Sequence, residues 1–521
     1  MQTESTYVLV VGGSLVGSSA ALFLAQHGVP AILVERHAGS SRHPRAIGYT
    51  PRTLELLRSV GLGADIPEVP KDFRLVRARV ESLAGKWLEE SDWTPPTPDI
   101  APKEFSPSLG AAIAQDVMEP MLRDKARELG ADLRMSTELL RFEQDEHGVT
   151  AVVRQRDGRE YTIRAAYMLA ADGGKSPVRE ALAISQQGRG HMRTVRSVLF
   201  RAPLEQYLAR GVHQFEIDQP DFKAFLTTYN DGRWVLMFSD DAERDQAELR
   251  AAIVRALGRD DLPIEIITTG RWELGALVAE QFRKGRVFLA GDAAHCLPPT
   301  RGGYGANTGI HDAHNLSWKL AAVHAGTSTP ALLDSYDLER RPVAWVRHQQ
   351  IFARNDYKAA GRGISDGVAI LDDDAMEFGQ LYRSRAVSGA GAELPDARRP
   401  DEWAGQPGTR AQHLWIERNG QRISTLDLFQ RGWVLLTEDA RWDAAVARAR
   451  GELGVRIDGV VVNRDIRFTS GAEFGVAFGV GGSGASLTRP DGHVAWRAME
   501  LPADPAATLL AALREVSSAA R

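Results

Sequence analysis

"YVLVVGGSLVGSSAALFLAQHG", residues 7–28, decides the fold that we expect of this chain. Tyr7 to Val11 is an unbroken apolar run, typical of a buried parallel strand. From Ser18 to His27 apolar residues recur at helical spacing, and Gly28 is placed to end the helix. "PAILVE", residues 30–35, predicts a second buried strand. A strand, a tight turn, a helix and a second strand in this order predict a Rossmann-like α/β unit.

The turn after the first strand nearly spells the dinucleotide fingerprint G-x-G-x-x-G. Gly12 and Gly17 take the outer positions, and Ser14 takes the middle one. A serine fits there if its φ stays negative, and the free N–H groups of the following helix bind phosphate whatever that side chain is. The second strand then supplies a carboxylate that can accept a ribose hydroxyl. The predicted cofactor contacts of this unit are Gly12, Ser14, Leu15, Val16, Gly17, Glu35 and Arg36.

A complete match to the same fingerprint occurs late in the chain. "GVGGSG", residues 479–484, contains Gly479, Gly481 and Gly484. No strand and helix of the required kind flank it, because Pro490 stands where a helix would continue and Pro-Asp-Gly predicts a turn between two short strands. We therefore interpret the perfect motif as a connection and the imperfect one as the cofactor site.

Composition restricts the function classes. With 521 residues, the chain is long enough for two to four domains, and its net charge of −5 without a basic block argues against nucleic acid as a partner. The single cysteine, Cys296, excludes an intrachain disulfide and a cysteine-rich metal site, and we predict no metal. No apolar run has the length of a membrane span, and no room is left for a signal peptide. We expect a cytoplasmic monomer or homodimer.

Three further stretches carry chemistry. Residues 42–62 place Arg42, Arg45 and Arg52 after the second strand, where a guanidinium can meet a pyrophosphate; a solvated basic turn is an equal alternative for Arg42 and Arg52. Residues 167–182 contain a strand that ends in Asp172 and Gly173 before a helix begins.

The most informative stretch is "GRVFLAGDAAHCLPPTRGGYGANTGIHDAHNLSWKLAAVHAG", residues 285–326. A buried strand ends at Asp292, whose carboxylate can accept a ribityl hydroxyl. Gly302, Gly303 and Gly305 allow the backbone to lie flat against a planar ligand. A helix predicted over residues 307–325 would direct its partial positive charge at that ligand, which suits a flavin that becomes anionic on reduction.

In this order the motifs resemble the FAD-dependent aromatic hydroxylases, the single-component flavoprotein monooxygenases related to p-hydroxybenzoate hydroxylase. The resemblance covers roughly residues 7–390. "VVGGSLVG", "RAIGYTPRTLELL", "YRSRAV" (residues 382–387) and the long C-terminal extension are most similar to bacterial polyketide hydroxylases such as aklavinone 11-hydroxylase. Two features depart from the family pattern: Ser14 replaces glycine, and "PPTRGGYGAN" is one residue longer.

The resemblance implies roles for named residues. Gly12, Gly17 and Glu35 would hold the AMP half of FAD. The other implied FAD contacts are Arg45, Gln115, Asp172, Gly173, Gly291 and Asp292, with Pro299, Gly303, Gly305, Ala306 and Asn307 in the loop against the isoalloxazine ring. Asp172 and Gly173 would also serve the nicotinamide cofactor. Arg45 and Arg383 are the candidate catalytic residues, as polar contacts near the ring.

The predicted fold class is α/β with three domains. The Rossmann-like FAD-binding domain takes residues 1–73, 102–180 and 281–395, and a β-sheet substrate domain takes residues 74–101 and 181–280. Residues 400–521 form a C-terminal domain that, by the resemblance, is thioredoxin-like. It has no Cys-x-x-Cys, so it cannot do redox work and a packing role remains.

The region between about residues 186 and 272 alternates like a sheet, in "SVLFRA", "HQFEID", "KAFLTTY" and "RWVLMFSD". Its aromatic residues are either core or the wall of an aromatic pocket against the flavin, and we select Phe225, Trp234 and Trp272 as candidate substrate contacts. Replacing a pocket aromatic by alanine should weaken substrate binding and leave the FAD content intact.

Three other features could be metal sites or reactive groups. His311 and His314 could form a metal pair, but helix-surface and capping contacts are favoured because no third ligand is evident. A solvated acidic turn is favoured over a cation site at residues 372–374. Cys296 is interpreted as a small packing residue.

The resemblance implies the hydroxylation of a polycyclic phenolic polyketide. NADPH, or NADH, would visit transiently and reduce tightly bound FAD, O₂ would add at C4a as a hydroperoxide, and its distal oxygen would pass to an electron-rich ring carbon. The protein would hold the ring, exclude water and stabilise the reduced flavin, which needs no catalytic triad. Two alternatives stay open: a flavoprotein that oxygenates, inactivates or halogenates an aromatic drug, and a non-catalytic aromatic-binding protein.

Overall fold

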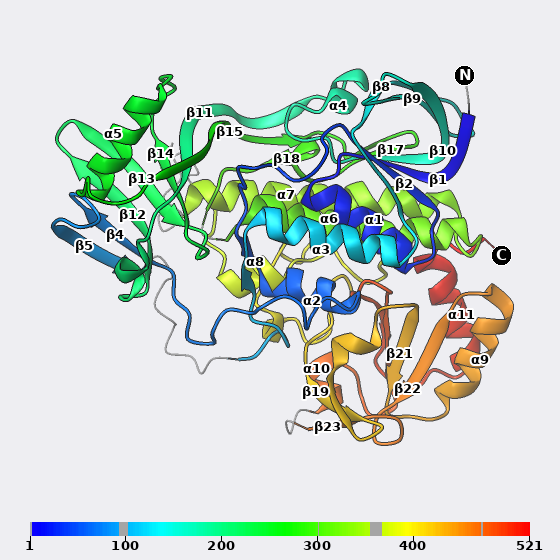
Figure 1. Cartoon of the computed structure of the whole chain (residues 1–521). Coiled ribbons are helices and arrows are strands. Elements are labelled where there is room, and N and C mark those ends of the chain that lie inside the picture. Colours follow the sequence, from blue (N-terminus) through cyan, green and yellow to red (C-terminus); the bar gives the residue numbers. More distant parts are fainter. Residues whose placement is uncertain (1–2, 93–102, 301, 355–366, 470–472, 521) are drawn as a thin grey trace.

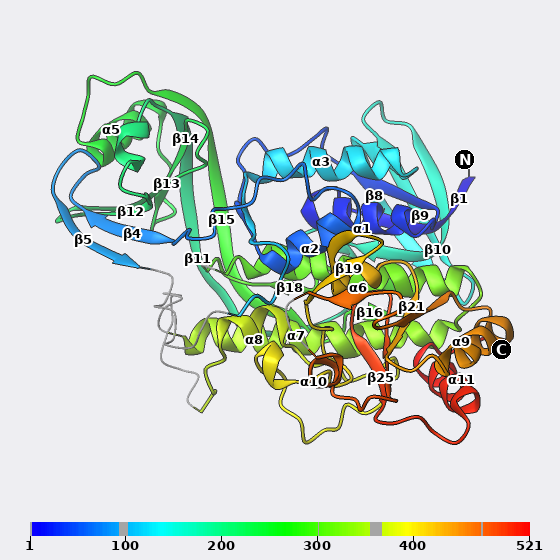
Figure 2. The same cartoon turned by 90° about the horizontal axis from the view of Figure 1, so that it is seen from below.

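The computed structural model describes residues 3–92, 103–300, 302–354, 367–469 and 473–520. Three parts pack together (Figures 1 and 2): a parallel-stranded layer with helices α1, α3, α6 and α7, a second sheet beside it, and a C-terminal α/β unit below. The expected boundary between residues 101 and 102 lies outside the described residues. The other expected domain bounds stay predictions.

The first sheet has the strand order β16-β17-β10-β1-β2-β7, with β8 and β9 attached beside β10. Its members are β1 (Thr3–Val11), β2 (Ala31–Glu35), β7 (Asp132–Met135), β8 (Thr137–Gln144), β9 (Val149–Gln155), β10 (Glu160–Ala170), β16 (Arg283–Lys284) and β17 (Val287–Leu289). β1 runs parallel to both β2 and β10, and β10 runs parallel to β17. Segments from three distant stretches of the chain therefore end at one edge of the same sheet.

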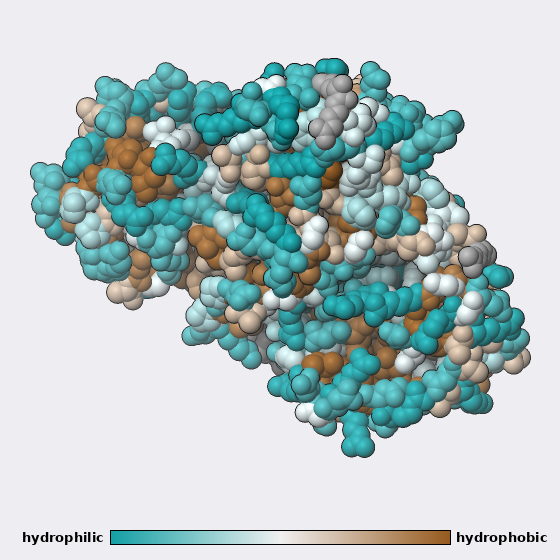
Figure 3. All heavy atoms as spheres, turned by 45° about the vertical axis from the view of Figure 1, so that its right-hand side comes forward, coloured by the Kyte–Doolittle hydropathy of each residue, from teal (hydrophilic) through white to brown (hydrophobic). Residues whose placement is uncertain are grey.

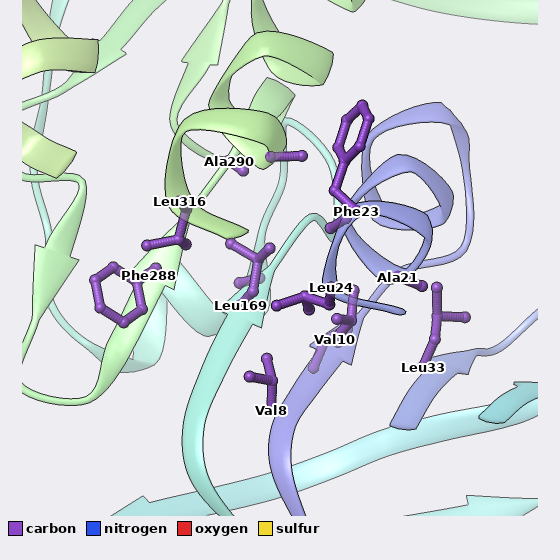
Figure 4. Packing of buried hydrophobic residues seen from close by; sticks show 14 of the residues in the cluster. Val8, Val10, Ala21, Phe23, Leu24, Leu33, Leu169, Phe288, Ala290 and Leu316 are labelled. Atoms are coloured by element: carbon purple, nitrogen blue, oxygen red, sulfur yellow. The ribbon is translucent and has the colours of Figure 1, made fainter. Parts of the chain in front are cut away.

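The central strands of this sheet are buried, because α1 packs against β1 and β2 and strand β8 also contacts β2. This burial explains their unbroken apolar sequences. The main helices are α1 (Leu15–Gln26), α2 (Pro51–Ser59), α3 (Gln115–Glu128), α4 (Pro177–Ala181), α6 (Tyr304–His324), α7 (Ser335–Ala353) and α8 (Asp373–Phe378). Figure 4 shows Val8, Val10 and Leu169 of the strands packed beside Leu24 of α1 and Leu316 of α6. All five side chains are buried.

The second sheet has the order β18-β15-β11-β14-β13-β12-β4-β5. Its strands are β4 (Val76–Val80), β5 (Trp87–Asp92), β11 (Gln186–Arg201), β12 (Val212–Gln219), β13 (Phe222–Thr228), β14 (Arg233–Phe238), β15 (Glu265–Ala279) and β18 (His295–Cys296). The four expected strand segments all fall in β11 to β14. One face packs against α5 (Gln246–Leu257) and forms a separate core. The long β11–β15 ladder joins this sheet to the first part (Figure 2).

The C-terminal unit contains a four-stranded sheet of order β22-β21-β24-β25. β21 (Trp433–Thr437) and β22 (Ile457–Val461) are parallel and are joined through α9 (Trp442–Leu453); β24 (Ala485–Thr488) and β25 (Val494–Ala498) form a hairpin, followed by α11 (Pro505–Val516). β19 (Trp415–Arg418), β20 (Gln421–Ser424), β23 (Arg467–Phe468) and α10 (Phe474–Phe478) complete it. This order is compatible with the thioredoxin-like expectation, which stays a prediction.

The face of the molecule in Figure 3 is mostly hydrophilic, with hydrophobic side chains in separate patches. Among the described residues, no helix combines the length and apolar character needed to cross a bilayer. One element differs from expectation: α6 begins at Tyr304, three residues before the predicted start, because Gly303 adopts a left-handed conformation (φ 57°) at the N-cap and turns the chain into the helix.

Candidate active site

The turn between β1 and α1 has the tight backbone packing that its glycines predict. Gly12 has φ 101°, and a Cβ there would lie 2.3 Å from the carbonyl oxygen of Ala171; a Cβ on Gly17 would lie 1.8 Å from the oxygen of Gly12. Ser14 is the N-cap of α1 with φ −77°, so a serine is accommodated as the negative-φ condition requires. No described side chain caps this helix, and no acidic residue lies in its first turn. Its N–H groups are therefore oriented to bind an anion.

A polar network from α3 holds this turn. Ser14 Oγ donates to Glu119 Oε1 over 2.6 Å, and Gln115 Nε2 donates to both Ser14 Oγ and Glu119 Oε1. Gln115 Oε1 in turn accepts the backbone N–H groups of Arg45 and Ala46. Gln115 thus connects the glycine turn to the arginine segment, which the resemblance alone does not show.

Glu35 lies at the end of β2, as predicted for a ribose acceptor. Its carboxylate accepts the backbone N–H groups of Gly13 over 2.6 Å and His37 over 2.8 Å. Arg36 is exposed, and its Nε contacts the ring of His37. Leu15 is buried and Val16 half-buried in the first turn of α1.

Asp172 and Gly173 follow β10 at the same edge of the sheet. One carboxylate oxygen of Asp172 accepts the backbone N–H of Val178 at the start of α4. The other oxygen is buried and has no hydrogen-bond partner among the described atoms. Burial raises the pKa of the Asp172 carboxyl. Gly173 takes φ 90°, which turns the chain sharply after the aspartate.

Gly291 and Asp292 form a turn where α1 and α6 meet. A Cβ on Gly291 would lie 2.8 Å from Val16 Cγ2, and a Cβ on Gly309 of α6 would lie 2.8 Å from Gly291 Cα. The side chain of Asp292 is exposed to solvent, although many protein atoms lie close around its carboxyl group. Burial raises the pKa of the Asp292 carboxyl, and His295 and Arg45 oppose that rise. The carboxylate is thus available as an acceptor beside two helix N-termini.

The loop expected against the ring leads into the N-terminus of α6. Pro299 is exposed, and Gly303, Gly305 and Ala306 are half-buried. The side chain of Asn307 is fully engaged with protein: Oδ1 accepts from Thr50 N and Thr53 Oγ1, and Nδ2 donates to the oxygens of Gly48 and Gly303. Asn307 therefore fixes the loop, and its amide has no capacity left for a direct contact with the ring.

Arg45 and Trp272 come together from different domains. Arg45 is exposed, and its Cζ lies 5.6 Å from the centroid of the Trp272 ring on β15. The segment that carries Arg45 is held by two further contacts to the second sheet: Tyr229 donates to the carbonyl of Pro44, and His43 contacts Ser197. The second sheet therefore docks against the arginine segment.

The two faces of the second sheet separate the substrate candidates. Phe225 is half-buried on the face away from α5, where the Arg77 guanidinium lies 5.1 Å from its ring centroid. Val235 and Leu199, on the same side, pack with Ala114 of the first domain. Trp234 points the other way: it is 1% exposed, in the core with α5. Because successive strand residues face opposite sides, Trp234 cannot form the expected wall between this sheet and the first domain; it lines a cavity on the α5 side together with Arg250.

Arg383 also departs from expectation. Its guanidinium donates to the carbonyls of Gly391 and Leu394 and pairs with Asp396. These contacts tie down its own loop, so Arg383 is corrected from a catalytic candidate to a structural residue. Arg52 likewise is neither a phosphate contact nor a solvated turn. It is buried and pairs with Glu55 over 2.7 Å.

The histidines on α6 are more buried than predicted. His311 is 7% exposed and contacts the hydroxyl of Thr53, and His314 packs edge-on against Phe23. His311 is a core group, whereas His314 is half-buried. Within the described ranges, no group of three potential ligands could hold a metal ion. The acidic turn at residues 372–374 caps α8 and pairs with Arg399.

These residues fit a bound FAD. Four features lie at one edge of the sheet. They are the close backbone packing at Gly12, the N-termini of α1 and α6 without side-chain caps, the accessible carboxylate of Asp292, and the Asp172 oxygen that has no hydrogen-bond partner among the described atoms. Sequence reasoning missed Glu119 and Arg123, an i, i+4 pair on α3 whose arginine also donates to the carbonyl of Gly13. It also missed Gly309 and Asp312, although a glycine and an acid inside an apolar helix were visible signals.

A Rossmann-like cofactor layer facing a mainly antiparallel sheet defines a two-domain flavoprotein with a C-terminal addition. Residues 5–350 match the FAD binding domain family, and residues 404–520 match the C-terminal domain of aromatic-ring hydroxylases. The chain belongs to the family of FAD-dependent aromatic-ring hydroxylases, the flavin-dependent polyketide hydroxylases and monooxygenases among them.

Curated relatives and solved structures match over almost the whole chain. Tetracenomycin A2 monooxygenase-dioxygenase of Streptomyces glaucescens is 39% identical, with 99% of this chain and 97% of the relative covered. The 4-methyl-5-nitrocatechol 5-monooxygenase of Burkholderia sp is also 39% identical, with 98% and 97% covered. The crystal structure of aklavinone-11 hydroxylase with FAD and aklavinone superposes with a TM-score of 0.88 at 36% identity, covering 98% of this chain and 99% of that one.

Proposed function

We propose that this enzyme uses FAD and NAD(P)H to hydroxylate a polycyclic phenol of the aromatic polyketide class. The proposal rests on one observation. The face of the second sheet that points away from α5 packs against the segment that bears Arg45, next to the turns that would hold FAD. A planar aromatic ring placed between them would lie beside the flavin. The similarity to proteins named for tetracenomycin and aklavinone supports the substrate class.

FAD held by these turns would supply the redox chemistry of the overall reaction, in which the phenol, NAD(P)H, one proton and O₂ give the hydroxylated phenol, NAD(P)⁺ and water. The N-termini of α1 and α6 would stabilise the negative charge of the pyrophosphate and of the reduced flavin. The Asp292 carboxylate would accept a ribityl hydroxyl. Arg45, held by Gln115 from one side and stacked by Trp272 on the other, would place a positive charge at the junction with the substrate.

The chain's residues supply position and exclusion of water, and not a strong acid or base. Phe225 and Trp272 offer aromatic surface on the side of the sheet that faces the first domain. Leu199 and Val235 keep the neighbouring part of this face apolar. Such a surface holds an electron-rich ring near the flavin and keeps water away from it, which are the two conditions for productive oxygen transfer.

The test combines colour, turnover and isotope labelling. We expect the purified protein to carry flavin absorbance and to oxidise NADPH faster when a tetracyclic phenol is added. Under ¹⁸O₂ the product should gain one labelled oxygen atom. A colourless protein that FAD cannot reconstitute, or NADPH oxidation that no phenol in the panel accelerates, would contradict the proposal.

A monocyclic control sharpens the substrate class, because one relative is named for a nitrocatechol. We expect kcat/KM for the tetracyclic phenol to exceed that for a substituted catechol by at least about tenfold. The reverse order would assign the enzyme to small phenols. Binding of the phenol without NADPH turnover would favour the aromatic-binding alternative.

A further inference from the structure

A buried carboxylate, Asp312 of α6, lies directly beneath the proposed ribityl turn. It is 0% exposed and accepts three hydrogen bonds: from the backbone N–H of Gly291 over 3.2 Å, from His295 Nε2 over 2.6 Å, and from Arg340 Nε over 2.8 Å. Gly291 and His295 are the two ends of the turn that presents Asp292. A single carboxylate thus holds both ends of the turn.

The second oxygen of Asp312 connects this turn to α7. Arg340 is 1% exposed, and besides Asp312 its guanidinium donates to Tyr382 Oη over 2.8 Å and to the carbonyl of Thr308. Although burial alone would raise it, His295 and Arg340 hold the pKa of the Asp312 carboxyl below its usual value. The carboxylate therefore stays ionised, which strengthens the hydrogen bonds that it accepts.

The C-terminal domain contacts Glu339, which precedes Arg340 on α7, and Tyr382, whose hydroxyl accepts from Arg340. Arg489 Nη1 donates to Glu339 Oε1 over 2.6 Å, and Nη2 donates to Glu339 Oε2 over 3.0 Å. Lys319 of α6 donates to Glu339 as well. The ring of His493, next to this arginine on the hairpin β24–β25, stacks on Tyr382 at 4.3 Å with an interplanar angle of 17°. Side chains of the C-terminal domain therefore hold Glu339 by an ion pair and Tyr382 by ring stacking.

We propose that the C-terminal domain acts as a positioning element for the cofactor: through Arg489 and His493 it holds Glu339, Arg340 and Tyr382, which fix Asp312 and hence the Gly291–Asp292 turn. The inference rests on the proposed function, because the turn matters only if FAD binds there. Asp312, Arg340 and Tyr382 are positioning residues, since none of them reaches the surface at the turn. This role gives a function to a C-terminal domain that has no cysteine pair.

The test compares two buried hydroxyl deletions of equal chemistry. Tyr382→Phe removes the acceptor of Arg340 and keeps the stack with His493. Thr437→Val removes a buried hydrogen bond to the carbonyl of Gly484 and the acceptor of the Asp439 N–H, inside the C-terminal domain and off the connecting path. Tyr382→Phe loses the hydrogen bond from Arg340 and Thr437→Val loses two hydrogen bonds, so both should lower the melting temperature, the control at least as much. We expect only Tyr382→Phe to weaken FAD, by about tenfold (~1.4 kcal/mol), measured by titrating apoprotein with FAD and following the quenching of flavin fluorescence.

Two further measurements separate positioning from general destabilisation. Asp312→Asn should weaken FAD more than Tyr382→Phe, and the double variant should bind FAD no more weakly than Asp312→Asn alone, because the hydroxyl acts through the carboxylate. Equal FAD dissociation constants for Tyr382→Phe, Thr437→Val and the wild type would overturn the inference, as would fully additive losses in the double variant. Wild-type protein that binds no FAD would instead contradict the proposed function.

Discussion

Gly309→Ala should separate cofactor binding from helix stability. Gly309 lies inside α6, where a Cβ would come within 2.5 Å of Val16 Cγ2 and 2.8 Å of Gly291 Cα. Carbon atoms in contact are about 3.5–4.0 Å apart. Either α6 or the turn that bears Asp292 must therefore move by about 1 Å, and the second obstacle is backbone, which no rotamer change can relieve.

The magnitude follows from two opposing effects. Alanine stabilises a helix interior by roughly 0.8–1.0 kcal/mol relative to glycine. Overpacking a close contact costs about 1–3 kcal/mol. The folded protein should therefore lose up to about 2 kcal/mol, while FAD binds at least about tenfold more weakly because its turn is displaced. Calorimetry or thermal denaturation followed by circular dichroism gives the first quantity, and flavin fluorescence titration gives the second.

Gly451→Ala is the matched control, because this glycine lies inside α9 and a Cβ there would meet nothing within 4 Å. We expect it to raise the melting temperature by a few degrees and to leave FAD binding unchanged. If Gly309→Ala also raised the melting temperature and bound FAD like the wild type, the close packing of α1, α6 and the Gly291 turn would have no role in the site.

Three further outcomes are expected. Burial lowers the pKa of His348 to about 4, so below pH 6.5 the unfolded chain binds a proton that the folded chain does not. The free energy of unfolding should therefore fall by ~1.4 kcal/mol between pH 7.5 and 5.5 because of this residue. Urea denaturation of His348→Leu should show a loss smaller by that amount. Glu55→Gln leaves the buried Arg410 guanidinium without its ionic partner, so chemical denaturation should show a loss of about 3–5 kcal/mol. Trp234→Ala should cost about 3–5 kcal/mol of stability, whereas Phe225→Ala should weaken phenol binding and leave both stability and FAD content close to the wild type.

The parts of the site that the sequence predicts are those governed by local backbone geometry. Gly12 and Gly17 have close contacts with backbone a few residues away or on the adjoining strand, so a short motif with its flanking strand and helix identifies them. Ser14 fits because its φ is negative. Residues 479–484 connect the short helix α10 to strand β24, so they lack the preceding strand and the following helix that the fingerprint requires.

The errors concern partners that are distant in sequence. Strand alternation shows that Trp234 and Val235 point to opposite faces, but it does not show which face α5 covers. Arg52 looks like a phosphate ligand until Glu55 and the C-terminal domain are placed beside it. Arg383 was chosen by resemblance, and its true partners lie in the loop that follows it. The predicted start of α6 at residue 307 is too late, because Gly305 weakens the helical pattern at the true start, Tyr304.

The strand order of the first sheet also bears on synthesis at the ribosome. Strand β1 gains one neighbour, β2, early, but Thr3 pairs with Thr162 and Met168 pairs with Val287, so the other neighbours arrive only as distant segments emerge. At typical elongation rates of ~5–20 residues per second, β1 waits many seconds with an apolar edge uncovered. Cofactor loading has to follow translation of α6, and nascent chains of this enzyme should depend on chaperones until then.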